Sequence, residues 1–64
     1  MHHGRVKSYS TVSGYGFILS DHGEFFFHVT AISMYWRPAA GDEVTFAIAS
    51  RNGRNYATNV RLCD

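Results

Sequence analysis

The sequence predicts an all-β fold, a small closed barrel of five short strands in a single domain, residues 1–64. Short runs rich in Val, Ile, Phe, Tyr and Thr alternate with turn signals. No segment keeps the three- and four-residue apolar spacing of an amphipathic helix over the roughly 11 residues that the pattern needs. A chain of 64 residues is short even for one domain. Closure into a barrel would remove strand edges that could otherwise pair with another chain.

The expected strands are separated by residues that favour turns and loops. They span residues 4–10, 15–19, 24–29, 43–50 and 56–62. Asp21-His22-Gly23 suits a three-residue hairpin turn, and Asn52-Gly53 is the strongest hairpin signal in the chain. Residues 33–42 form the long connection, because Pro38 and Gly41 oppose a continuous strand. A short helical turn is expected at residues 30–34.

Aromatic side chains are more numerous than so small a core can bury. Ten of the 64 residues are Phe, Tyr or Trp, so some must lie on the surface, where an aromatic cluster usually marks a binding site. Side chains alternate between the two faces of a strand, so one face of each strand can supply the core. The expected core is Val6, Ile18, Phe25, Phe27, Val44, Phe46, Ile48, Val60 and Leu62.

This assignment directs Tyr15, Phe17, Phe26 and His28 outward as one contiguous patch on two neighbouring antiparallel strands. The opposite assignment would bury a histidine and a tyrosine hydroxyl, each of which would need a polar partner. Such a patch suits single-stranded nucleic acid, because stacking a base on an aromatic ring contributes about 1–3 kcal/mol. Two alternatives stay open: a protein-interaction module that uses the same face, or rings that a loop covers as a satellite core.

Basic residues near this face could contact phosphates. They are Arg5, Lys7, Arg51 and Arg54. The net charge of +1 neither demands nor forbids a polyanionic partner.

The composition argues against several other classes. The single cysteine, Cys63, excludes an internal disulfide, and in the absence of a secretory signal we expect a reducing, cytoplasmic location. No apolar run approaches the roughly 20 residues of a membrane span. Nucleophile-elbow, phosphate-loop and zinc-deaminase motifs are missing, so we expect no enzyme, no cofactor and no small-molecule substrate.

Histidines raise the question of a metal site. His2 and His3 lie in a terminus that we expect to be mobile, either native or the remnant of a tag, and His22 lies in a turn. No cysteine or carboxylate cluster joins them, so we expect no bound metal. We expect a monomer, although the connection at residues 33–42 could open and exchange halves between two chains.

The same residues resemble the cold-shock domain family over essentially the whole chain. The family's first RNA-binding motif, Lys-Gly-Phe-Gly-Phe-Ile, is matched by Ser-Gly-Tyr-Gly-Phe-Ile at residues 13–18. Its second, Val-Phe-Val-His-Phe, is matched by Phe-Phe-Phe-His-Val at residues 25–29. Flanking matches lie at residues 4–7, 31–32, 41–46 and 57–60. The resemblance implies a five-stranded antiparallel OB-fold barrel that binds single-stranded RNA and DNA, prefers pyrimidine-rich stretches, and acts as an RNA chaperone or cold-shock-type regulator.

The resemblance also implies a set of contact residues. Position by position, these are Lys7, Tyr15, Phe17, Phe26 and His28. Further assignments are Glu24 at the family's acidic base-edge position, Tyr9 as the strand-one aromatic, Tyr35 or Trp36 in the long loop, and Arg51 or Arg54 in the last loop.

Three residues depart from the family pattern. Ser8 stands for a tryptophan, Ser13 for a lysine and Val29 for a phenylalanine, which removes two stacking platforms and one phosphate contact. Losing two stacks would weaken binding by about one to four decades if nothing compensated. Tyr35 and Trp36 could compensate in part. We therefore expect the family's activity at lower affinity or with a shifted base preference.

Overall fold

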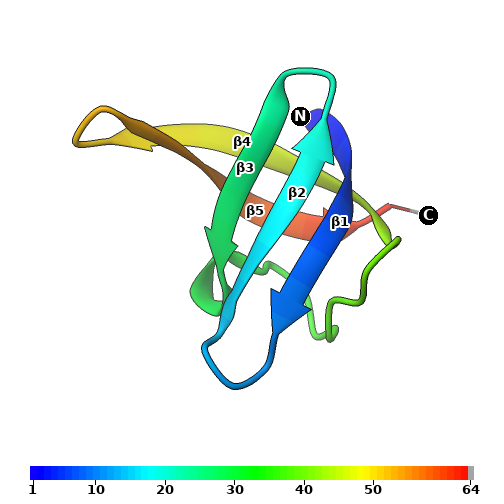
Figure 1. Ribbon diagram of the computed structural model, residues 1–64. Coiled ribbons are helices and arrows are strands. Elements are labelled where there is room, and N and C mark those ends of the chain that lie inside the picture. Colours follow the sequence, from blue (N-terminus) through cyan, green and yellow to red (C-terminus); the bar gives the residue numbers. More distant parts are fainter. Residues whose placement is uncertain (64) are drawn as a thin grey trace.

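A closed five-stranded barrel forms the whole of the computed structural model, which describes residues 1–63 (Figure 1). Asp64, the last residue of the expected domain, lies outside the described residues. The strands are β1 (His2–Ser10), β2 (Tyr15–Ser20), β3 (Gly23–His28), β4 (Glu43–Arg51) and β5 (Arg54–Leu62). One turn of 3-10 helix, η1 (Val29–Ala31), follows β3. Within residues 1–63, no helix has the length and apolarity needed to cross a membrane.

The all-β barrel expected from the sequence is confirmed. Its spatial order is β1-β2-β3-β5-β4, and the pairings β1–β2, β2–β3, β1–β4 and β4–β5 are antiparallel. β3 and β5 close the barrel through a parallel contact at Phe26 and Tyr56. In Figure 1, β1, β2 and β3 form the near wall, and the β4–β5 hairpin projects beyond it.

Two tight turns connect the hairpins. Asn52 and Gly53 have φ of 53° and 77°, so both central residues of the β4–β5 turn take the positive φ that a type I′ turn requires. The β2–β3 loop is one residue shorter than the expected three-residue turn, because Gly23, at φ 117°, already pairs with Ser20. The Ser20 hydroxyl accepts a hydrogen bond from the backbone N–H of His22 at 3.1 Å, which stabilises this turn.

The core confirms most of the expected inner face. Its members, each at most 5% exposed, are Val6, Ile18, Phe25, Phe27, Val44, Phe46, Ala57 and Val60. Ile48 and Leu62, expected in the core, are only half-buried, and Ile48 packs against the cluster from its margin. Ala57, which is not among the expected core residues, is fully buried.

A β-bulge explains this correction in β5. Thr45 pairs with Arg61 and Ala47 pairs with Thr58, so β5 carries one more residue than β4 between these pairs. Asn59, with φ of 52°, lies in this extra segment. A bulge reverses the alternation of side chains, so residues 57 and 60 both face the core, three positions apart.

A second irregularity lies in β1. Val6 pairs with Ile18 and Ser8 pairs with Phe17, so Lys7 is the extra residue. Ser8 therefore shares the outer face with Phe17. Tyr9 turns inward, where its ring stacks on Phe27 with centroids 5.8 Å apart and an interplanar angle of 11°.

The long connection between η1 and β4 is attached to the barrel by Asp42. Its carboxylate accepts hydrogen bonds from the indole N–H of Trp36 at 3.1 Å and from the backbone N–H of Ala39 at 3.0 Å. Its backbone carbonyl accepts from Val6 at 2.9 Å. Trp36 packs against the core, and Pro38 is buried. The connection thus covers one end of the barrel.

The helical turn expected at residues 30–34 begins and ends earlier, at Val29–Ala31. His28 caps it, because the His28 side chain accepts a hydrogen bond from the backbone N–H of Thr30. Ile32 then pairs with Val60 in an isolated parallel bridge, which ends the helical turn.

Gly16→Ala should destabilise the fold. A Cβ atom at residue 16 would lie 2.6 Å from Phe27 Cζ and 2.7 Å from the backbone oxygen of Ser8, and neither the buried ring nor the backbone can yield easily. We expect the free energy of unfolding in urea to fall by about 1–3 kcal/mol. Gly53→Ala is the matched control, because its Cβ would meet nothing within 4 Å and only the positive φ opposes it. An equal or larger loss at Gly53 would contradict the packing argument.

Asp42→Ala should lower the stability of the barrel. The change leaves the Trp36 and Ala39 N–H groups without their carboxylate acceptor, so we expect the free energy of unfolding to fall by about 1–3 kcal/mol. Trp36 fluorescence should shift to longer wavelength as its indole becomes more hydrated. Asp21→Ala, in an exposed turn, serves as the control and should change neither quantity. An unchanged emission spectrum in Asp42→Ala would count against the proposed attachment.

Candidate nucleic-acid interface

The aromatic patch consists of Tyr15, Phe17, Phe26 and His28 on the outer face of β2 and β3. Tyr15 pairs with His28 and Phe17 pairs with Phe26 across the two strands. Ring centroids of Tyr15 and Phe26 are 5.1 Å apart, those of Tyr15 and His28 are 4.9 Å apart, and those of Phe17 and Phe26 are 6.1 Å apart. The expectation of one contiguous patch is confirmed.

These rings are open to solvent. Tyr15 is 45% exposed, Phe17 39% and Phe26 38%. The alternative in which a loop covers them as a satellite core is therefore excluded. An exposed set of aromatic rings that touch one another is a surface suited to binding another flat or apolar group.

His28 is held in place at the end of this patch. Its Nδ1 accepts a hydrogen bond from the backbone N–H of Thr30 at 3.3 Å and lies 2.9 Å from the Thr30 hydroxyl. Acceptance at Nδ1 leaves Nε2 as the nitrogen that carries the proton of the neutral ring. The imidazole meets Tyr15 edge-on, with an interplanar angle of 62°.

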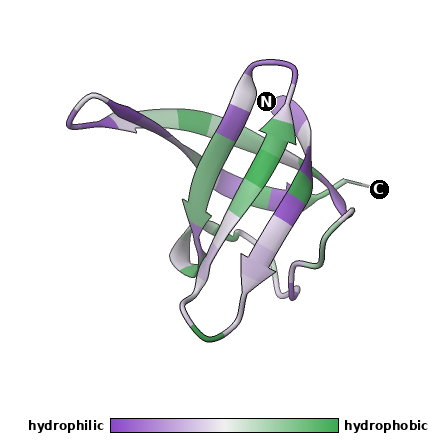
Figure 2. Cartoon of the chain, viewed as in Figure 1, coloured by the Kyte–Doolittle hydropathy of each residue, from purple (hydrophilic) through white to green (hydrophobic). Residues whose placement is uncertain are grey.

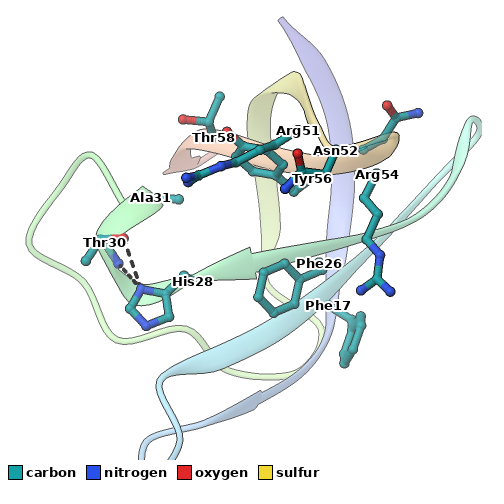
Figure 3. Close-up of a pocket in the computed structure, with 11 residues that line it drawn as sticks. Phe17, Phe26, His28, Thr30, Ala31, Arg51, Asn52, Arg54, Tyr56 and Thr58 are labelled. Carbon is teal, nitrogen blue, oxygen red and sulfur yellow. Dashed lines mark hydrogen bonds between the residues drawn. The ribbon is translucent and has the colours of Figure 1, made fainter.

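An open groove lies between β3 and the β4–β5 hairpin (Figure 3). Its volume is about 1010 Å3, at the upper end of the range of small-molecule sites. Its lining consists of Phe17, Phe26, His28, Thr30, Ala31, Arg51, Asn52, Arg54, Asn55, Tyr56 and Thr58. Figure 3 shows Phe26 and His28 on one wall, and Tyr56 and Thr58 on the other.

The groove exists because β3 and β5 barely pair. In the described part of the chain, Phe26 and Tyr56 are the only residues at which β3 pairs with β5. The Ile32–Val60 bridge makes the next contact beyond β3. A twisted pair of strands joined at so few points diverges, and the opening between them is lined by outward side chains of both.

Some of the basic side chains around this surface form ion pairs and others do not. The Lys7 ammonium lies 3.1 Å from a Glu24 carboxylate oxygen, and the Arg5 guanidinium lies 3.8 Å from Glu43. Arg51 and Arg54, by contrast, form no ion pair within residues 1–63. Figure 2 shows that the tip of the β4–β5 hairpin is hydrophilic, whereas β2 and β3 carry hydrophobic stretches.

The structure brings only some of the expected site residues together. Arg51 and Arg54 join Phe17, Phe26 and His28 in lining the groove. Lys7 and Glu24 lie beside the patch as an exposed ion pair. Tyr35, in the long connection, is fully exposed but does not line the groove.

Two expected contact residues lie elsewhere. Tyr9 faces the core and stacks on Phe27, and Trp36 packs against the core with its indole N–H bonded to Asp42. Tyr56, which lines the groove, was missed. Its orientation depends on the bulge at residue 59, which strand alternation alone does not reveal.

The N-terminal histidines belong to a strand, although the sequence predicted a mobile terminus. His2 and His3 belong to β1 and pair with Phe46 and Thr45 of β4. The His2 ring meets the His22 ring edge-on, with centroids 5.0 Å apart. Among the described residues there is no group of three or more His, Cys, Asp or Glu side chains that could hold a metal ion.

Comparison with known proteins agrees with the barrel architecture. Residues 2–63 match the model of the 'cold-shock' DNA-binding domain. The chain is also 37% identical to the cold shock-like protein CspA of Rickettsia typhi over an alignment of 68 positions, which covers 92% of this chain and 90% of that protein. Cold-shock domains bind nucleic acid and are not enzymes. A match over nearly the whole barrel shows that this chain belongs to the cold-shock domain family, as a nucleic-acid-binding protein of the cold-shock type.

Proposed function

We propose that this protein binds single-stranded RNA and DNA by stacking bases on the aromatic patch, with low sequence specificity and a preference for pyrimidine-rich stretches. In the cytoplasm it would act as an RNA chaperone or cold-shock-type regulator. The observation that carries this proposal is the row of exposed, mutually touching rings across β2 and β3.

Stacking accounts for affinity without sharp sequence specificity. Every base has a π face, and each stack on an aromatic ring contributes about 1–3 kcal/mol. Phe17 and Phe26 offer no hydrogen-bonding group, so a base resting on them is not read through its edges. A preference for pyrimidines would arise from the ease with which weakly stacked pyrimidine runs leave their own stack.

Basic side chains supply the phosphate contacts in this proposal. Arg51 and Arg54 are available at the groove. Lys7 would have to exchange its Glu24 partner, at 3.1 Å, for a phosphate. Glu24 would then be left free to accept a hydrogen bond from a base, in the role that the family resemblance assigns to this position.

The three residues that depart from the family pattern all reduce the number of contacts that this surface could make. Ser8 lies on the outer face beside Phe17, Val29 is exposed next to η1, and Ser13 lies in the loop before β2. Each would remove a contact that a larger or charged side chain could make. Weak and rapidly reversible binding suits a chaperone, which must release an RNA after melting its secondary structure.

The decisive measurement is fluorescence anisotropy of a labelled oligothymidine of about seven nucleotides. We expect saturable binding that weakens with salt, with a log–log slope of about −0.7 for each phosphate contact. Phe17→Ala or Phe26→Ala should each weaken binding about 5- to 150-fold, and the double variant should bind more weakly than either.

Leu19→Ala is the matched control, since Leu19 is an exposed apolar residue of β2 outside the aromatic patch. It should leave the affinity within about twofold. The proposal fails if the native protein shows no binding at high micromolar concentration. The aromatic patch would then be assigned to a protein partner.

Ser8→Trp should tighten oligothymidine binding about 5-fold or more, because residue 8 pairs directly with Phe17 and an indole there would extend the patch onto β1. The same anisotropy titration measures the change. Ser8→Leu is the control, since it adds apolar bulk beside Phe17 without a flat π face, and it should leave the affinity within about twofold. Unchanged or weaker binding by a folded Ser8→Trp variant would count against stacking as the source of affinity.

A further inference from the structure

We propose that Tyr56 is an additional base-stacking residue, and that Arg51 and Arg54 hold the adjoining phosphates, so that a bound single strand crosses the groove onto the β4–β5 hairpin. This inference rests on the proposed function and names where its binding surface extends. No matched motif of the family covers residue 56.

A single row of cross-strand partners carries the argument. Ser8 pairs with Phe17, Phe17 with Phe26, Phe26 with Tyr56, and Tyr56 with Ala49. Directly paired residues direct their side chains toward the same face of a sheet. Phe17, Phe26 and Tyr56 are therefore three successive aromatic positions across β2, β3 and β5.

The side chain of Tyr56 makes no ring contact or hydrogen bond with the described part of the protein. Its partner on β4 is the small Ala49, so no bulky cross-strand neighbour covers it from that side. The ring lies on the wall of the groove opposite Phe26 and His28 (Figure 3).

The charges of the hairpin point to an anionic ligand. Arg51 and Arg54 are direct cross-strand partners, an arrangement in which like charges repel. Neither has an acidic partner within the described residues. Tyr56 follows Arg54 by two positions and shares its face of β5. A phosphate between the two guanidinium groups would relieve their repulsion while the attached base reaches Tyr56.

Compared with the family pattern, the row of aromatic residues is therefore shifted by one strand, away from β1 and toward β5. At its β1 end the row begins with Ser8, where the family has a tryptophan, and at its β5 end it continues to Tyr56. The footprint of the bound strand should therefore extend toward the hairpin rather than toward β1.

Length dependence of binding tests this extension. Oligothymidines of about four and about nine nucleotides should be titrated against the native protein, Tyr56→Phe, Tyr56→Leu and Phe17→Ala. Tyr56→Leu keeps apolar bulk but removes the π face. We expect it to weaken binding of the longer oligonucleotide about 5- to 100-fold and of the shorter one less than about twofold. Tyr56→Phe should bind both as the native protein does.

Photo-crosslinking gives a readout that a purely structural role for Tyr56 would not produce. A 5-bromouracil-substituted strand should crosslink to the tryptic peptide of residues 55–61, in which Tyr56 is the sole aromatic residue.

Arg54→Gln tests the phosphate contact. It should reduce the magnitude of the log–log salt slope of binding by about 0.7, because one phosphate contact is lost. It should also raise the melting temperature of the free protein at low salt, because it removes a like-charge pair.

The outcomes separate this inference from the proposed function. If Tyr56→Leu binds the longer strand as tightly as the native protein while Phe17→Ala loses affinity, the inference is wrong and the proposed function stands. An absence of crosslinks on residues 55–61 would likewise overturn it. If the native protein binds neither oligonucleotide, the proposed function fails and the inference falls with it.

Discussion

Burial of Phe25 and Phe27 on the inner face of β3 is the constraint on which the outer surface depends. Both rings are at most 5% exposed, and Gly16 allows β2 to lie against Phe27 without a Cβ atom in between. Because neighbouring side chains of a strand point to opposite faces, this burial forces Phe26 and His28 outward. The register of β2 and β3 then places two further rings beside them. The packing of the core therefore also determines which aromatic rings are exposed in the patch.

The ends of the outer row depend on two irregularities instead. The extra residue Lys7 in β1 places Ser8 outside and Tyr9 inside, and the extra residue in β5 near Asn59 places Tyr56 outside. One inserted residue reverses the face of every side chain beyond it. Regular alternation therefore positions the centre of the binding surface, whereas bulges decide how far the surface extends on either side.

This division also explains how much the sequence alone could predict. The strands, the Asn-Gly turn and the central patch follow from alternation and turn chemistry over short distances. The exposure of Tyr56 and the burial of Ala57 were not predicted, because Asn59, a residue that only moderately favours positive φ, is a weak bulge signal. The sequence did not separate Tyr35 from Trp36 as the aromatic of the long connection. The hydrogen bond from Trp36 to Asp42 depends on how that connection folds back, which no local pattern reveals.

The electrostatic properties of the surface also depend on the local arrangement of charges and not on the net charge of the chain. A net charge of +1 gives little information about partners. The structure nevertheless pairs Arg5 and Lys7 with carboxylates, whereas Arg51 and Arg54 on one hairpin form no ion pair within residues 1–63. Local potential, not net charge, attracts a polyanion. Under the proposed function the patch is an uncharged stacking surface and the hairpin is its charged end. Salt would therefore loosen the hairpin end first, and a bound strand would begin to dissociate there while its bases still rest on β2 and β3.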